Sequence, residues 1–220
     1  GESATPILDE MAKMGLRLDN FYAAHPTCSP TRGSFLTGRH PNRFGTFSPG
    51  FSIRPKEITM AHLLAKAGYR CGHFGKWHLG PVKKGSPTNP RVMGFHEYVS
   101  HDNFYEMDPP LSRNGGPPEI LKGEGSEVTI GETLRFIEDT AKKKQPFLAV
   151  IWNLAPHDPF LAPEVDRKPY AHLSEKEQHY WGQITNIDKN VGRLRRALRE
   201  HGVADNTMLV FTSDNGAVKY

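Results

Sequence analysis

The sequence predicts an α/β fold, and three observations lead to that prediction. Segments with helical apolar spacing alternate along the 220-residue chain with short apolar segments typical of strands. Two of the latter, 147–153 and 207–212, are runs of the kind that a largely parallel sheet buries on both faces. Apolar residues make up 37% of the chain, and 21 glycines add to them, which suits a globular core.

Most of the predicted helices have recognisable boundary signals. Proline or threonine opens the three early helices, and glycine follows each of these and the last helix. The predicted helices are 5–14, 30–37, 59–67, 127–143 and 175–201.

The predicted strands are 16–22, 69–74, 147–153 and 207–212, identified by alternation or by a short apolar run. Residues 81–125 are rich in Pro, Gly and Asn and predict one long loop. Because long loops in compact domains are usually functional, we expect substrate contacts there and in 158–172.

Polar residues follow three of the predicted strands. Lys76 and His78 follow the strand at 69–74, His157 follows the strand at 147–153, and Asp214 with Asn215 follows the last strand. In open α/β sheets ligands bind beyond the carboxyl ends of the strands. We therefore expect these side chains to meet at one edge of the sheet.

Composition excludes some classes of function. Lys plus Arg number 28 against 24 for Asp plus Glu, and the basic cluster at 193–199 is interpreted as a solvated helix face, so no nucleic-acid partner is expected. The longest apolar run, 147–152, is far shorter than the roughly 20 residues of a membrane span, so no membrane partner is expected either. An anionic small substrate remains open.

Cysteine usage points to one chemically interesting thiol. Cys28 and Cys71 match no metal, redox or disulfide spacing, and Cys71 is interpreted as structural. Cys28 lies at the amino end of a predicted helix, one turn before Arg32, where both features favour anions. The alternative is a small buried Cys and a surface Arg. A phosphatase-type nucleophile is discounted, because that loop needs five residues between Cys and Arg, and three intervene here.

The other candidates also have two interpretations each. Lys76 and His78 could straddle a site, or be a solvated Lys and a hydrogen-bonded His. His157, between two prolines, could shuttle protons near neutral pH or be a turn residue. Asp214 and Asn215 offer oxygens suited to Ca²⁺ or Mg²⁺, but two ligands are few and Asp-Asn-Gly is also a common turn.

The order of these motifs favours the functional interpretation. The run Cys28-Ser29-Pro30-Thr31-Arg32, followed by Thr37-Gly38-Arg39, resembles the signature of the sulfatases. Further segments resemble that family in the same order: Thr5-Pro6, Gly75-Lys76-Trp77-His78-Leu79-Gly80, Pro156-His157 and Ser213-Asp214-Asn215-Gly216.

The resemblance implies an alkaline-phosphatase-like sandwich, with a largely parallel central sheet flanked by helices, and a sulfuric ester hydrolase acting on sulfated carbohydrates or on aryl or alkyl sulfates. It implies that a separate maturation enzyme oxidises Cys28 to formylglycine, whose hydrate attacks sulfur. By the same resemblance Arg32 would hold the hydrate, Lys76 would bridge it to the sulfate, His78 would assist sulfate elimination, and His157 would protonate the leaving oxygen.

The resemblance also implies a metal. Asp214, Asn215 and the modified residue 28 would bind Ca²⁺, with Mg²⁺ as the alternative. The family draws further ligands from two aspartates ahead of the Thr5-Pro6 segment, which have no counterpart here, and Lys219 is too close to Asp214 to match a later family lysine. We therefore expect residues 1–220 to be a sulfatase catalytic amino-terminal domain truncated at both ends.

Two other functions stay open at this point. One is a phosphonate or phosphodiester hydrolase of the same superfamily, and the other is a truncated, non-catalytic relative. The family suggests a periplasmic or secreted location, on which the residues themselves are silent.

Overall fold

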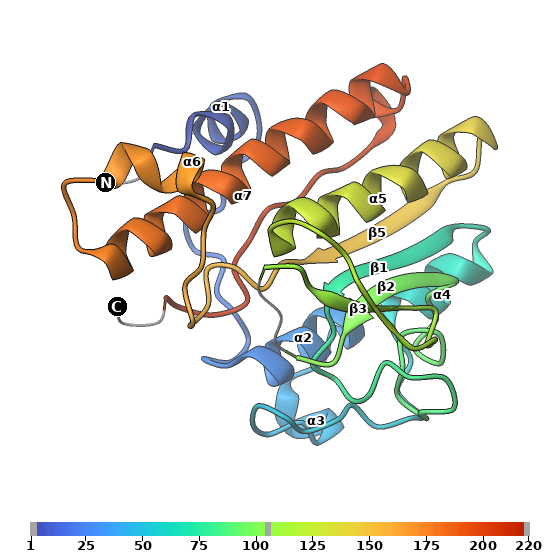
Figure 1. Ribbon diagram of the computed structural model, residues 1–220. Coiled ribbons are helices and arrows are strands. Elements are labelled where there is room, and N and C mark those ends of the chain that lie inside the picture. The colour runs from blue at the N-terminus through green and yellow to red at the C-terminus, as the bar shows by residue number, and fades with distance from the viewer. Residues whose placement is uncertain (1–3, 104–106, 218–220) are drawn as a thin grey trace.

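A computed structural model describes residues 4–103 and 107–217 of the chain. A five-stranded mixed sheet in the order β4-β3-β2-β1-β5 forms its centre (Figure 1). Strand β1 (Arg70–Lys76) pairs in parallel with β2 (Glu97–His101) on one side and with β5 (Phe147–Trp152) on the other. The antiparallel strands β3 (Pro110–Arg113) and β4 (Pro118–Ile120) extend the edge beyond β2. The α/β class is thus confirmed.

Helices cover both faces of the sheet. The long helices α5 (Gly125–Lys142) and α7 (Glu175–Glu200) lie side by side over one face (Figure 1). Helix α4 (Met60–Lys66) packs on β1 from the other side, near α2 (Cys28–Thr37). The remaining short elements are α1 (Pro6–Met14), α3 (Pro41–Phe44), α6 (Glu164–Arg167) and the 3₁₀ turns Lys168–Tyr170 and Ala204–Asn206.

Alternation along β1 builds two separate cores. Cys71 points into the cluster shared with α4, whereas Phe74 points into the cluster shared with α5 and α7. Phe74 lies opposite Ile151 of β5 and stacks obliquely on Phe136 of α5, with ring centroids 5.4 Å apart. The central strand is therefore buried on both faces, and its carboxyl end has a fixed position.

Helix α1 is capped at its amino end by a residue that is distant in the sequence. It has no buried residue, and Thr5 makes no side-chain cap. Instead, the backbone amides of Ile7 and Leu8 donate to the Asp188 carboxylate of α7, over 3.2 and 2.8 Å. A carboxylate at a helix amino terminus satisfies open N–H groups and complements the helix dipole.

Two predicted strands were wrong. Residues 16–22 and 207–212 are irregular, and no strand in the described part of the chain pairs with them. Most of their apolar side chains are exposed, with Leu16 84% and Met208 90% exposed, whereas Leu209 packs against the core. Alternation predicts a strand only where a neighbouring backbone completes the hydrogen-bond ladder.

The long loop predicted over 81–125 was also wrong, because it contains β2, β3 and β4. These strands have five, four and three residues, and Pro110 and Pro118 begin the last two. Strands this short, interrupted by proline, carry almost no periodic signal. Lys219 lies outside the described residues.

Candidate active site

Helix α2 presents Cys28 from its first position. Seven of its ten residues are buried, so the helix is embedded while Cys28 itself stays half-buried. The Ser29 hydroxyl accepts a hydrogen bond from the amide of Gly50, over 3.1 Å, which ties the following loop to the helix start. The residue predicted to carry the chemistry therefore lies at the accessible end of an otherwise buried helix.

Lys76 reaches Cys28 from the end of β1. Its Nζ lies 3.6 Å from Cys28 Sγ, and the residue is only 1% exposed. Burial, and then the charge of Arg32, lower the pKa of the Lys76 ammonium, while Cys28 and Asp214 oppose that shift. A buried ammonium this close to residue 28 favours an anion there.

Arg32 joins three parts of the chain. Its Nη1 donates to the Lys76 carbonyl oxygen over 3.0 Å, and its Nη2 donates to Asp214 Oδ2 over 2.8 Å. The guanidinium also lies over the ring of Trp152, with Cζ 4.8 Å from the ring centroid. These contacts bring the helix start, the end of β1 and the Asp-Asn-Gly segment together as expected, although the segment before Asp214 is irregular and is not the predicted strand.

His78 follows β1 in a left-handed backbone conformation, with φ of 54°. Its amide donates to the Asp102 carbonyl over 2.8 Å, and Asp102 also accepts from the amide of Val82, which fixes the segment. Burial, then the charges of Lys76 and Arg32, lower the pKa of His78 to about 4. The imidazole is therefore neutral near pH 7 and able to accept a proton.

His157 lies in the segment after β5, half-buried. Its Nδ1 lies 2.7 Å from the Asp158 carbonyl oxygen, and since a carbonyl only accepts, Nδ1 is the donor of that bond. Its charge also lowers the pKa of His78, so the two imidazoles lie within electrostatic reach of each other.

Asp214 and Asn215 offer oxygen ligands of the type that Ca²⁺ prefers. Asn215 Oδ1 is buried and has no hydrogen-bond partner among the described residues, while its Nδ2 donates to the Gly216 carbonyl over 2.9 Å. A buried amide oxygen without a donor is suited to a cation. Across residues 4–103 and 107–217, no three His, Cys, Asp or Glu side chains form a metal-binding group. Asp214 and Asn215 fit a hard cation in donor type and would supply part of its shell.

Sequence reasoning missed two residues beneath the site. Trp152 and His73 lie within predicted strands, and their spacing in the sequence does not distinguish them from ordinary core residues. His73 is fully buried, its Nδ1 lies 2.7 Å from Ser100 Oγ, and its ring meets Trp152 edge-on with centroids 4.9 Å apart. Cys71 is buried, which fits its interpretation as structural, and burial raises its pKa to about 11.

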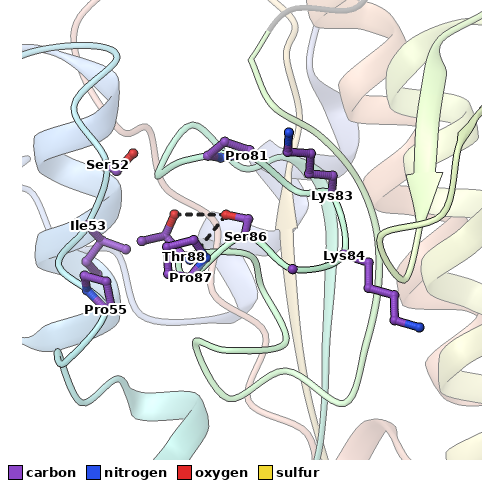
Figure 2. Close-up of a pocket in the computed structure, with 10 residues that line it drawn as sticks. Ser52, Ile53, Pro55, Pro81, Lys83, Lys84, Ser86, Pro87 and Thr88 are labelled. Carbon is purple, nitrogen blue, oxygen red and sulfur yellow. Dashed lines mark hydrogen bonds between the residues drawn. The ribbon is translucent and has the colours of Figure 1, made fainter.

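A separate pocket of about 560 Å³ lies between the segments 52–55 and 81–88 (Figure 2). The hydroxyl oxygens of Ser86 and Thr88 lie 3.4 Å apart, and Lys84 points away from them (Figure 2). None of the predicted site residues lines this pocket. Substrate contacts from 81–125 stay a prediction.

The whole chain, residues 1–220, matches the family model described as Sulfatase. The chain belongs to the sulfatase family. N-acetylgalactosamine-6-sulfatase of Homo sapiens is 34% identical over 245 residues, which cover 97% of this chain and 45% of that protein. The ulvan-active sulfatase of Formosa agariphila is 32% identical, covering 96% of this chain and 45% of that protein.

Solved structures agree with this sulfatase assignment. The crystal structure of Ps i-CgsB superposes with a TM-score of 0.84 at 25% identity, over 93% of this chain and 51% of that one. The fold is therefore the alkaline-phosphatase-like α/β fold of sulfatases, as the motifs implied. The chain spans about half the length of the curated sulfatases it matches. No helix in the described part of this sulfatase chain has the length and apolar content needed to cross a bilayer.

Proposed function

We propose that the protein containing this chain hydrolyses sulfate monoesters, using formylglycine formed from Cys28 by a maturation enzyme. The observation that carries the proposal is the position of Cys28, accessible at a helix amino end and 3.6 Å from the buried ammonium of Lys76. Once formed, formylglycine supplies a hydrated aldehyde, with one oxygen to attack sulfur and a second hydroxyl whose deprotonation releases sulfate.

The cations of the site bind and orient the sulfate. Lys76 is held by β1, and Arg32 is held by the Lys76 carbonyl and Asp214, so neither charge has to reorganise as the ester binds. Fixed charges of this kind stabilise the negative charge that develops in a transition state. Ca²⁺, bound through Asp214 and Asn215, would add further positive charge toward the sulfate oxygens.

The two imidazoles move protons. His78 is neutral because its pKa is about 4, so it accepts the proton whose removal frees sulfate from residue 28. His157 donates a proton to the ester oxygen as it leaves, so the alcohol departs uncharged. In the proposed reaction His78 is therefore the general base and His157 the general acid.

The relatives support a carbohydrate substrate. Two are named N-acetylgalactosamine-6-sulfatase and ulvan-active sulfatase, and Ps i-CgsB was crystallised with k-i-k-neocarrahexaose. We propose a sulfated carbohydrate as the natural substrate class, with aryl sulfates as convenient assay substrates.

Mass spectrometry of the peptide containing residue 28 tests the proposal, on the full-length protein made in a host that has the maturation enzyme. The expected result is an aldehyde or its hydrate, with hydrolysis of 4-nitrocatechol sulfate that the Cys28→Ala variant lacks. An unmodified thiol and no hydrolysis would instead indicate a non-catalytic relative. Faster hydrolysis of a matched phosphate or phosphonate ester than of the sulfate would indicate the phosphorus chemistry of the superfamily.

A further inference from the structure

Trp152 lies directly beside the end of β1. It is the last residue of β5, and its backbone is in register with Gly75, the residue before Lys76. Its indole ring lies under the guanidinium of Arg32, with Cζ 4.8 Å from the ring centroid. No motif of the sequence pointed to this residue.

The indole supplies the contact that the other partners of Arg32 cannot. The Lys76 carbonyl and Asp214 accept from Nη1 and Nη2, and both of those bonds lie along N–H directions in the guanidinium plane. Trp152 instead places the face of its ring against the guanidinium, with Arg32 Cζ over the ring, and so contacts the group from a third side. Arg32 Nε is buried and has no hydrogen-bond partner among the described residues, so its N–H is one of the donors still open to a ligand.

Trp152 is itself held by aromatic neighbours. It stacks on Trp77, with centroids 6.0 Å apart and planes 24° apart, and meets Phe35 edge-on at 6.0 Å. The buried His73 packs edge-on from below, and burial together with Arg32 lowers the His73 pKa well below its usual value. The side chains that surround Trp152 are therefore aromatic and uncharged.

We propose that Trp152 is a positioning residue that fixes the plane of the Arg32 guanidinium, so that Arg32 meets the sulfate group in one orientation. This inference rests on the proposed function, in which Arg32 serves the sulfate ester. A leucine at 152 fills part of the same volume but lacks the negative ring face that attracts the cation, so the guanidinium is free to tilt.

Substitutions that grade the ring test this role in the full-length matured protein. With 4-nitrocatechol sulfate, we expect Trp152→Leu to lower kcat/KM about tenfold, and Trp152→Phe, which keeps a ring face, by no more than about threefold. The matched control is Phe147→Leu, which removes an aromatic ring from the opposite end of β5, where Phe147 lies across from Arg70. Its kcat/KM should equal that of the wild type. Thermal midpoints of all variants are measured as well, to detect any loss of stability. Equal losses of kcat/KM in Trp152→Phe and Trp152→Leu would overturn the proposal.

A second background separates positioning from a general structural effect. If Trp152 acts through Arg32, Trp152→Leu should have little further effect on an Arg32→Gln protein. A tenfold loss in both backgrounds would overturn the proposal. Calorimetry of inorganic sulfate binding gives the same comparison without turnover. It uses the wild type, Trp152→Leu, Arg32→Gln and the double variant. A wild type that hydrolyses no sulfate ester, yet binds sulfate about tenfold more tightly than Trp152→Leu, contradicts the proposed function and supports the role of Trp152.

Discussion

Arg32 and Asp214 are 182 residues apart in the sequence and form an ion pair in which Nη2 lies 2.8 Å from Oδ2. The Arg32 side chain is 6% exposed and the Asp214 side chain 31%. The pair joins the start of α2 to the Asp-Asn-Gly segment, so it holds two motifs of the site at one place.

Asp214→Asn should therefore reduce both stability and activity. The variant leaves a buried guanidinium without its counter-charge, at a cost of about 1–2 kcal/mol after allowance for the partial exposure of Asp214. Urea unfolding checks this value. The control is Asp19→Asn, which removes the exposed ion pair with Arg17 and should leave the unfolding midpoint unchanged. Equal midpoints for the two variants would contradict the prediction.

Lys76→Met should separate stability from activity. The variant removes a buried ammonium, whose pKa is already lowered by burial, and puts an apolar chain of similar length in its place. The thermal midpoint should therefore equal or exceed that of the wild type. Sulfate ester hydrolysis should fall at least about 100-fold, because a fixed cation next to residue 28 is lost. Lys66→Met, on the exposed end of α4, is the control and should retain full activity.

Gly33→Ala should destabilise the protein although alanine favours helices. A Cβ at Gly33 would lie 2.4 Å from Cε2 of the buried Phe44 ring, so that ring would have to shift, at a cost of about 1–3 kcal/mol. The matched change is Gly131→Ala in α5, where nothing lies within 4 Å of the added Cβ. That variant should gain about 0.5–1 kcal/mol. Chemical unfolding of both measures the contrast, and a stabilised Gly33→Ala protein would refute it.

His73 should make stability depend on pH. Burial keeps its folded pKa well below 6.5, whereas the unfolded imidazole has its ordinary value, so the unfolded state binds the proton first as pH falls. This contribution is complete above about pH 6.5 and declines below it, by up to about 1.4 kcal/mol per pH unit. His73→Asn should flatten the decline in unfolding free energy between pH 6.5 and 5. Parallel curves for variant and wild type would exclude the effect.

The sequence predicted the meeting of these four side chains better than it predicted the sheet. Cys28, Arg32, Lys76 and Asp214 are linked by direct contacts. The start of α2 and the end of β1 follow from local patterns, whereas the segment before Asp214 is not the predicted strand. The short strands β3 and β4 were missed, since three or four residues starting at proline give no period to detect.

Trp152 shows a different kind of limit. Its spacing is that of a core strand residue, and its contact with Arg32 depends on how β5 is aligned with β1. The predicted strands at 16–22 and 207–212 failed for a related reason. Their apolar residues indicate strands, but pairing depends on backbone from elsewhere, which no local pattern encodes.

The sequence separation between contacting residues also determines when these contacts can form during translation. Asp188, which caps α1, and Asp214, which pairs with Arg32, follow their partners by about 180 residues. At roughly 5–20 residues per second, a ribosome needs on the order of ten to forty seconds to cover that interval. For that time the first helix lacks its cap and the guanidinium lacks its carboxylate. The amino-terminal part of the site therefore reaches its final geometry only after nearly all of these residues have been translated.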